Sequence, residues 1–311
     1  MKPFRVHDRK DRAYVAALAF GDFHVSKHGR KVRIEASSTH PAQIDLVTGL
    51  FNEYGKQIRY PIRSGRVVAW RVTYNLDRAF SFLFQAKDLV KKGLSSSRLF
   101  YSTLSGLTDS EGHVGLTRRG DTAYPVLTIS NTNRQIMQLL HHRLRCRGYP
   151  ANLEAREYSR GALIYEVSVR GVKALNLLRK LNLRHREKVL ARSIVLHASH
   201  SPKHSLGSYR RFRRQLELER DAYVLSAIEE YRKRKCRKAK RVRAFERVTA
   251  NAVMMRREGL TIEEIAKSLN RSKRTVYRLL GRKTRYGIPE ETEQANQGEK
   301  PVLAQARVQP S

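Results

Sequence analysis

The chain is poor in cysteine and in acidic residues. Its only cysteines, Cys146 and Cys236, stand far apart and outside any Cys-x-x-Cys pair. A disulfide framework or a cysteine zinc site is therefore not supported. Aspartate and glutamate number 28 against 63 lysines and arginines, which gives a formal net charge of +35. An excess of this size predicts a polyanionic partner, and nucleic acid is the usual one.

Long apolar runs are also absent. No stretch approaches the roughly 20 apolar residues that a membrane-spanning helix requires. The N-terminus shows no cationic segment followed by an apolar run. We therefore expect a cytoplasmic protein without a membrane partner. The length, with 40% hydrophobic residues, is enough for one core of about 200 residues and a small second domain.

An internal repeat organises residues 11–198. Residues 11–93 predict a helix, two strands, a helix, two strands and a helix, and residues 97–198 follow the same order. Within the repeat, Trp70-Arg-Val-Thr matches Tyr165-Glu-Val-Ser. The pattern predicts an α+β fold of two tandem αββαββα halves, and we expect a monomer with internal pseudo-two-fold symmetry.

Local signals predict where several of these helices begin and end. Asp11 is the expected N-cap of the first helix, and Ser97 is the expected cap of the helix that opens the second half. The apolar pattern over Arg78–Val90 predicts one helix.

The first helix of each half carries the strongest motif. Residues 104–114 are Leu-Ser-Gly-Leu-Thr-Asp-Ser-Glu-Gly-His-Val, and residues 15–25 are Val-Ala-Ala-Leu-Ala-Phe-Gly-Asp-Phe-His-Val. The small residues in both segments allow two helices to approach closely. Each helix then ends in a carboxylate, Asp22 or Glu111, which faces the unfavourable end of the helix dipole. Two such acids repel each other, and a bound divalent cation would relieve both effects.

These segments resemble the signature of LAGLIDADG homing endonucleases, and the resemblance covers about residues 11–198. It implies a pseudo-two-fold saddle that cleaves double-stranded DNA at a specific site, with Mg²⁺ held by the catalytic acids Asp22 and Glu111. In this family a basic or polar residue at the end of the last strand of each half assists catalysis. The corresponding candidates are Arg170 or Lys173 in the second half and Asn75 or Arg78 in the first, and Arg170 is the one we favour. Phe20 and Phe23 depart from the signature, so we expect the turn after Asp22 to be displaced.

The resemblance also implies a concave surface of strands that lies in the major groove of DNA. Arginine recognises guanine through a bidentate pair that contributes about 1–3 kcal/mol of discrimination. The candidate DNA-binding residues on or between the predicted strands are Arg33, Arg63, Arg71, Arg118, Arg119 and Arg156.

A second motif, over residues 259–281, resembles a resolvase-type helix-turn-helix. Thr261 and Glu264 have the spacing of a capping box, and Asn270 stands where the turn requires a left-handed residue. Ser272 is the expected cap of the recognition helix. The candidate DNA-binding residues of this helix are Lys273, Arg274, Thr275, Tyr277 and Arg278.

The sequence therefore predicts five parts. They are a first LAGLIDADG half (1–96), a second half (97–200), a basic helical linker (201–245), a helix-turn-helix domain (246–284) and a disordered tail (285–311).

Three functions fit this organisation. The first is a Mg²⁺-dependent homing endonuclease acting on double-stranded DNA. The second is a catalytically inactive DNA-binding transcriptional regulator, because bacterial sporulation regulators of the WhiA type also join a degenerate LAGLIDADG domain to a C-terminal helix-turn-helix. The third is an RNA maturase that binds intron RNA. The retained acids Asp22 and Glu111 favour the nuclease, whereas Phe23 argues against it.

Overall fold

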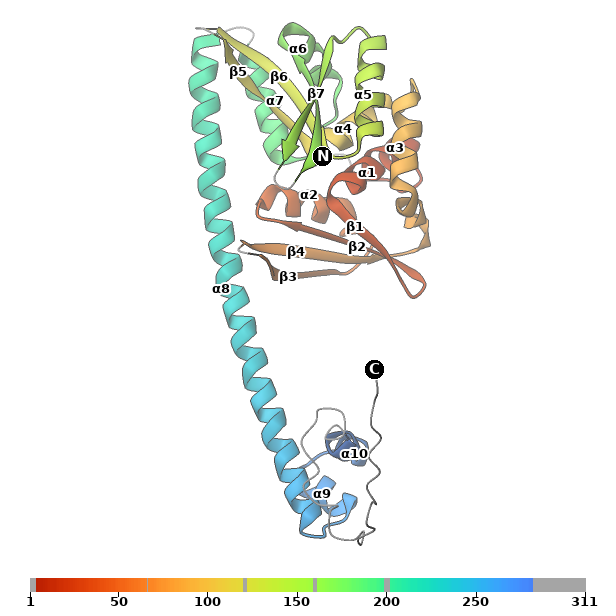
Figure 1. Cartoon of the computed structure of the whole chain (residues 1–311), viewed down its shortest axis with the longest axis vertical. Coiled ribbons are helices and arrows are strands. Elements are labelled where there is room, and N and C mark those ends of the chain that lie inside the picture. Colours follow the sequence, from red (N-terminus) through yellow and green to blue (C-terminus); the bar gives the residue numbers. More distant parts are fainter. Residues whose placement is uncertain (1–3, 66, 120–121, 159–160, 199–201, 282–311) are drawn as a thin grey trace, which may run out of the picture. The chain divides into compact units, whose positions relative to one another are not determined.

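The computed structural model describes residues 4–65, 67–119, 122–158, 161–198 and 202–281 (Figure 1). The chain divides into two compact units, residues 1–233 and 234–311. In the ranges described, none of the helices combines the length and the apolar character that a membrane crossing demands. The predicted tail (285–311) lies outside these ranges.

The first half of the first unit contains one four-stranded antiparallel sheet with the strand order β1-β2-β4-β3. Its elements are α1 (Arg9–Asp22), β1 (Phe23–His28), β2 (Lys31–Ser38), α2 (Pro41–Phe51), β3 (Gln57–Ser64), β4 (Val67–Leu76), the 3₁₀ helix η1 (Arg78–Gln85) and α3 (Ala86–Ser95).

The second half repeats this arrangement in a sheet with the strand order β5-β6-β8-β7. Its elements are α4 (Phe100–Glu111), β5 (Gly112–Arg119), β6 (Thr122–Asn131), α5 (Arg134–Cys146), β7 (Ala151–Tyr158), β8 (Ala162–Arg170), α6 (Gly171–Lys180) and α7 (Arg186–Ala198). The predicted fold of two tandem αββαββα halves is confirmed.

Some of the predicted helix ends differ from the structure. Asp8 caps α1 in place of Asp11, because its side chain accepts hydrogen bonds from the backbone amides of Lys10 and Asp11. The N-cap of α4 is Leu99, not Ser97, and no side chain caps the helix. Ahead of it, the Ser96 hydroxyl accepts from the Leu99 amide at 3.3 Å. The predicted helix over Arg78–Val90 is divided between η1 and α3.

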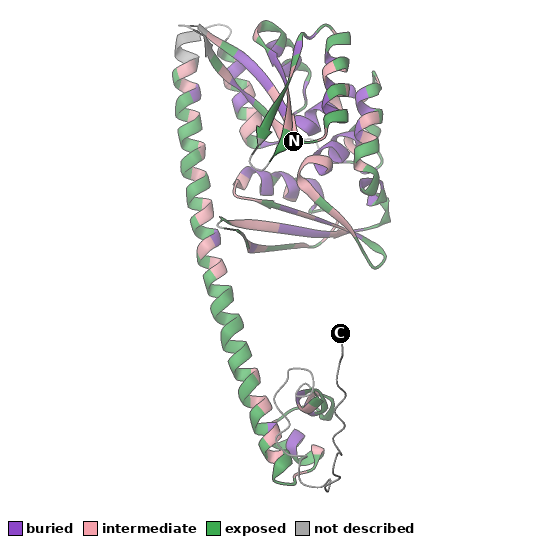
Figure 2. Cartoon of the chain, viewed as in Figure 1, coloured by how far each residue is buried: buried purple, intermediate pink, exposed green. Residues whose placement is uncertain are grey.

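Each sheet buries one face against helices, as the alternation along β2 shows. Val32, Ile34 and Ala36 are buried, whereas the residues between them face the opposite side and are more exposed (Figure 2). The buried side chains form one cluster for each half. The cluster of the second half also contains Val90 and Leu94 of α3.

Helix α8 (Pro202–Arg257) begins in the first unit. There, Tyr209 donates a hydrogen bond to the carbonyl of Val114 at the edge of β5, at 3.1 Å.

In the second unit, the end of α8 packs with α9 (Ile262–Ser268) and α10 (Lys273–Gly281) around Ala252, Ile265 and Val276. The predicted capping box is present. The Thr261 hydroxyl accepts from the Glu264 backbone amide, and the Glu264 carboxylate accepts from the Thr261 backbone amide. Asn270 has φ 48°, which is the left-handed conformation predicted for the turn.

Candidate functional site

The ends of α1 and α4 meet because glycine allows their backbones to touch. A Cβ atom added to Gly106 would lie 2.2 Å from the carbonyl oxygen of Tyr14, and one added to Gly21 would lie 2.8 Å from Cγ of Glu111. At Gly106 no side chain separates the two helices, and at Gly21 the side chains of Ser110 and Glu111 fill the space that a Cβ would need. Asp22 follows Gly21 in the chain, so its side chain lies near that of Glu111.

The environment of the two acids disfavours their charged forms. Burial raises the pKa of Asp22 to about 6, although Lys188 and Gln43 oppose the rise. Burial, followed by repulsion from Asp22, raises the pKa of Glu111 to about 7. Two partly buried carboxylates that repel each other at helix C-termini are the arrangement that the sequence predicts for a cation site.

One amide side chain from each half orients the acid of that half. Gln43 of α2 donates to Oδ2 of Asp22 at 2.6 Å, and Asn131 at the end of β6 donates to Oε1 of Glu111 at 3.0 Å. Among the described hydrogen bonds, neither Oδ1 of Asp22 nor Oε2 of Glu111 has a protein partner. One oxygen of each carboxylate is thus fixed, and the other remains available.

A buried lysine lies behind the acids at the end of α4. The Lys188 ammonium, from α7, donates to the carbonyl oxygens of Thr108, Asp109 and Ser110 at 2.6, 2.7 and 3.2 Å. The Thr108 carbonyl also accepts the backbone N–H of Gly112, whereas the carbonyls of Asp109 and Ser110 lie in the last turn, where helical donors run out. Three acceptors thus meet the three donors of the ammonium. Burial lowers the pKa of Lys188, and the neighbouring acids oppose this effect.

The lysine contact is made by one helix only. Lys188 places a positive group at the negative end of the α4 dipole, where it offsets the unfavourable position of Glu111. In the described part of α1, the last turn contains no basic residue. Lys188 therefore hydrogen-bonds to the end of α4, while its charge opposes the rise of the pKa of both Asp22 and Glu111.

The turn after each acid has the same form in the two halves, which corrects the displacement expected from Phe23. Phe23 has φ −108° and ψ 137°, and Gly112 has φ −91° and ψ 155°. Both residues are extended, so either helix passes directly into a strand. The conformation does not require glycine, which explains why phenylalanine is accommodated.

The donor set has the chemistry of a hydrated magnesium site. Two carboxylate oxygens are hard ligands, and Mg²⁺ keeps several waters and takes its other ligands from phosphate. Within the described residues, no group of three or more histidine, cysteine, aspartate or glutamate side chains could hold a metal ion. The residues therefore fit an ion that the protein holds by two acids, and not one enclosed entirely by protein.

Arg170, the predicted assisting residue, is exposed and lies away from this end of the sheet. Pairing between β6 and β8 runs from Val126 opposite Arg170 to Asn131 opposite Tyr165. Arg170 and Asn131, which binds Glu111, therefore stand at opposite ends of that pairing. The role of Arg170 stays a prediction, and Lys188 is the cation that lies beside the acids.

The strand arginines divide between the two faces of the sheets. The pairing register places Arg33, Arg71 and Arg156 on the sheet faces opposite the buried residues Ile34, Val72 and Val167, so they face away from the helices. Each has a partner there: Arg33 donates to Asn75, Arg71 pairs with Glu35, and Arg156 pairs with Glu154 and Glu166.

Of the other strand candidates, Arg63 lies on the opposite face of its sheet from Arg33 and Arg71. The alternation along β3 puts Arg63 on the side of the helices, where it donates to the carbonyl of Gly65 at 3.0 Å. The side chains of Arg118 and Arg119 are outside the described part of the structure. The ion pairs of Arg71 and Arg156 lie at the surface, where such a pair contributes at most about 1 kcal/mol. These two arginines can therefore exchange their partners for phosphate.

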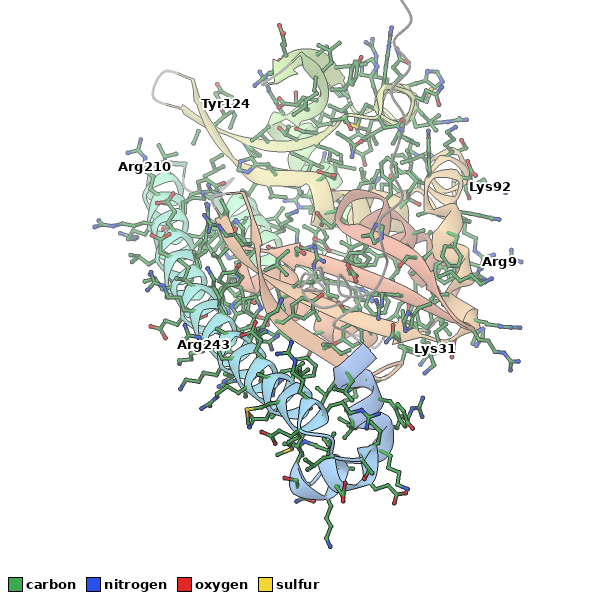
Figure 3. The ribbon with its side chains drawn as sticks, turned by 60° about the horizontal axis from the view of Figure 1, so that its bottom comes forward. Arg9, Lys31, Lys92, Tyr124, Arg210 and Arg243 are labelled. Carbon is green, nitrogen blue, oxygen red and sulfur yellow. The ribbon has the colours of Figure 1, made fainter. Side chains whose placement is uncertain are left out.

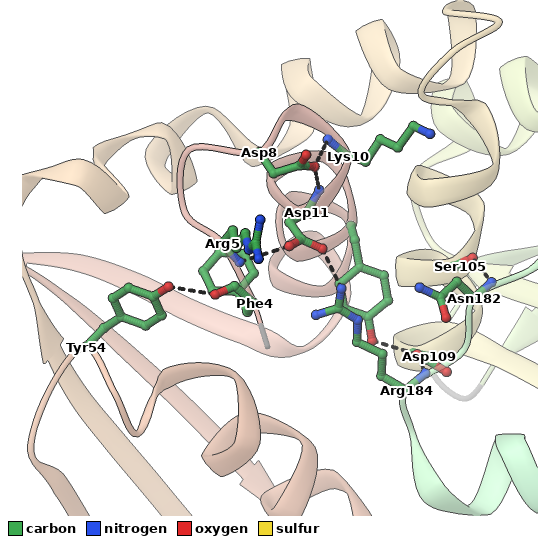
Figure 4. A network of polar contacts seen from close by, with 11 residues as sticks. Phe4, Arg5, Asp8, Lys10, Asp11, Tyr54, Ser105, Asp109, Asn182 and Arg184 are labelled. Atoms are coloured by element: carbon green, nitrogen blue, oxygen red, sulfur yellow. Dashed lines mark hydrogen bonds and ion pairs between the residues drawn. The ribbon is translucent and has the colours of Figure 1, made fainter. Parts of the chain in front are cut away.

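A polar network joins the two halves near the acids (Figure 4). Tyr14 of α1 and the backbone amide of Arg184 both donate to Oδ2 of the buried Asp109, each at 2.6 Å. The Arg184 side chain pairs with Asp11. Because these contacts link α1 to the second half, they hold α1 and α4 in register.

In the second unit, the predicted recognition helix exposes most of its candidates. Arg274, Tyr277 and Arg278 are exposed, and Lys273, also exposed, pairs with Glu263. Thr275 is half-buried, and its hydroxyl contacts that of Ser272 at 2.9 Å. Thr275 thus takes part in the helix cap.

The sequence interpretation did not identify Gln43, Asn131 or Lys188. A signal was present for the two amides, which follow the acids at nearly the same distance, 21 residues in one half and 20 in the other. Polar residues that keep their distance from a repeated acid are expected to share its site. Nothing in the sequence marks Lys188 among so many cations.

Comparison with known proteins gives matches for both units. A family model described as a homeodomain-like domain matches residues 243–290. None of the curated proteins matches the chain.

Solved structures similar to the chain include mesophilic variants of the homing endonuclease I-DmoI, with 14% identity over 56% of this chain and 95% of that chain and a TM-score of 0.40. The homing endonuclease I-WcaI bound to its DNA recognition sequence has 13% identity over 58% and 83%, with a TM-score of 0.43. The LAGLIDADG homing endonuclease I-GzeII in complex with its DNA target has 9% identity over 65% and 96%, with a TM-score of 0.37. These three solved structures are homing endonucleases, one of them named as a LAGLIDADG homing endonuclease, and the C-terminal match is a homeodomain-like domain.

Proposed function

We propose that this chain is a site-specific endonuclease of the homing type that hydrolyses double-stranded DNA with Mg²⁺. The observation that carries the proposal is the meeting of Asp22 and Glu111 at the adjoining ends of α1 and α4. Their raised pKa values show that the protein alone does not balance their charge. A divalent ion on a DNA phosphate would supply that balance.

The two acids would hold the ion with the oxygens that Gln43 and Asn131 leave available. When bound, the ion would polarise the phosphoryl oxygen and lower the pKa of an attacking water. The amides keep each carboxylate in one orientation, so little reorganisation is needed when DNA arrives. Lys188 fixes the end of α4 and would add a positive charge behind the two acids.

DNA would be held by cations of both units. Arg33, Arg71 and Arg156 lie on the helix-free faces of the sheets and can reach phosphates or base edges. The exposed residues Arg274, Tyr277 and Arg278 of α10 would contact a further part of the site through the groove. With contacts from both units, a single chain would recognise a long DNA sequence.

The decisive experiment is cleavage with matched acid variants. Purified protein and Mg²⁺ are incubated with a duplex made from the sequences that flank the gene, joined without it. We expect double-strand cleavage by the wild type, loss of cleavage in Glu111→Gln and Asp22→Asn, and unchanged DNA affinity in both. Glu53→Gln, at an exposed position outside the site, is the control and should cleave normally. An inactive wild type on this duplex contradicts the nuclease proposal.

A DNA-binding regulator without nuclease activity is the second candidate. It is favoured by the helix-turn-helix, whose contacts do not depend on the acids. This function predicts a footprint at promoters that persists in EDTA and is unchanged by Asp22→Ala. Metal-dependent cleavage of any specific duplex would exclude it.

A further inference from the structure

A strongly cationic segment of α8, Arg234–Arg243, lies in the second unit and is here named the basic segment. Seven of its ten residues are lysine or arginine, and none is acidic. All ten residues are exposed (Figure 2), and Arg243 is labelled at the end of the segment in Figure 3. A helix that is merely solvated usually mixes both signs of charge.

The cations of the basic segment surround the helix. Successive residues of an α-helix turn by about 100°. On this geometry, neighbouring cations around the circumference are separated by about 20–80°. Their order is Arg234, Lys238, Lys235, Arg243, Lys240, Arg237 and Arg241. A flat anionic surface would meet only one side of such a helix. An environment with anions on opposite sides would meet most of it.

This distribution is unfavourable without a counter-charge. Lys235 and Lys238 are three residues apart, as are Lys238 and Arg241, and like charges that adjoin on a helix surface repel each other. The exposed segment has no buried side chain to offset the repulsion. Bound phosphates would turn the repulsion into attraction.

The uncharged residues of the segment add a second feature. Ala239 and Val242 are three residues apart and lie on the same side of the helix. Val242 is 45% exposed in a segment that is otherwise almost wholly charged. Lys235 lies between them on the circumference, so this side of the helix offers two apolar residues together with a cation. In the DNA major groove, thymine presents a methyl group to apolar residues and guanine presents acceptors to lysine.

We propose that the basic segment binds double-stranded DNA by lying in the major groove. This groove is about 12 Å wide and admits an α-helix, whose diameter is about 10–12 Å, between two walls of phosphate. The cations contact phosphates on both walls, and Ala239 and Val242 face the base edges. The segment is a third DNA contact beside the strands and α10, so the inference rests on the proposed DNA-binding function.

The two cysteines provide a direct test in the full-length chain. Cys236 lies in the basic segment and Cys146 lies at the end of α5, and both are exposed. A saturating 40-base-pair duplex should slow maleimide labelling of Cys236 at least tenfold, while labelling of Cys146 stays unchanged as the internal control. Equal labelling of Cys236 with and without the duplex would overturn the inference.

Salt dependence supplies an independent measurement. The triple variant Lys238→Gln, Lys240→Gln, Arg241→Gln should reduce the slope of log affinity against log salt by about 2.7, since each phosphate contact contributes about 0.9. Glutamine retains helix propensity, and circular dichroism checks that the helix is intact.

The matched control neutralises three exposed cations on α1 and α3, with Arg9→Gln, Lys87→Gln and Lys92→Gln. Its slope should equal that of the wild type. If the two triple variants have the same slope while the wild type binds and cleaves DNA, the basic segment is not a contact and the proposed function stands. A wild type that binds no duplex contradicts both proposals.

Discussion

Replacement of Glu111 by glutamine should stabilise the metal-free protein while abolishing cleavage. Glutamine keeps the size of the side chain and can still accept a hydrogen bond from Asn131, but it carries no charge to be buried beside Asp22. The rise of the Glu111 pKa from 4.5 to about 7 corresponds to about 3 kcal/mol at 1.36 kcal/mol per tenfold change in proton affinity. Because the side chain is only partly buried, solvent screening reduces the expected gain to about 1–2 kcal/mol.

The sign of this effect depends on pH. The folded-state pKa of Glu111 is raised, so the folded protein holds a proton that the unfolded chain has already released. The contribution of Glu111 to the free energy of unfolding is therefore fully present below about pH 4.5 and is lost as the pH rises to about 7. Asp22 contributes in the same direction between about pH 4 and 6. The variant should match the wild type at pH 4.5 and exceed it at pH 8.

Thermal unfolding in EDTA, followed by circular dichroism at both pH values, measures the difference. A gain of about 1–2 kcal/mol corresponds to roughly 2–8 °C in Tm for a domain of this size. Added Mg²⁺ should raise the Tm of the wild type and leave that of Glu111→Gln unchanged. Glu53→Gln serves as the control. A variant no more stable than the wild type at pH 8 would refute the argument that the acids repel each other.

Three further changes test the contacts around the site. Gly106→Ala places a Cβ against the backbone of Tyr14, so we expect a loss of about 1–3 kcal/mol in urea unfolding and a loss of cleavage. Tyr14→Phe removes a donor from the buried Asp109 and should lower stability by about 1.5–3 kcal/mol, measured in the same way. Asn270→Ala forces alanine into a left-handed conformation; it should destabilise the second unit by about 1–2 kcal/mol and increase proteolysis there, whereas Asn270→Gly should not.

The sequence predicted the repeated halves well because their signals are local. Alternation along β2 and the capping box at Thr261 are set by neighbours in the chain. The helix ends were less predictable, since neighbouring polar residues compete for each role, two aspartates at α1 and three serines before α4. Asp11 has the spacing of an N-cap, but the fold uses it to pair with Arg184 of the other half. Arg184 is 173 residues from Asp11 in the chain, so no local sequence pattern predicts this ion pair.

The same distinction applies to the candidate site. The motif identified Asp22 and Glu111 because small residues and a terminal acid recur in both halves. The role of Lys188 could be recognised only from the structure, because its partners are backbone carbonyls, which every residue carries. Arg170 was chosen by its position at a strand end, and the pairing register of β6 and β8, which sequence does not reveal, places that end away from the acids.

The packing of α3 determines how the chain can be divided. Val90 and Leu94 precede the second repeat in sequence, yet they complete the hydrophobic cluster beneath the second sheet. A break between residues 96 and 97 would expose that cluster and leave two apolar surfaces prone to aggregation. Fragments meant to reassemble, or halves exchanged with another protein, should instead be joined before Ala86, so that α3 travels with the partner whose interior it fills.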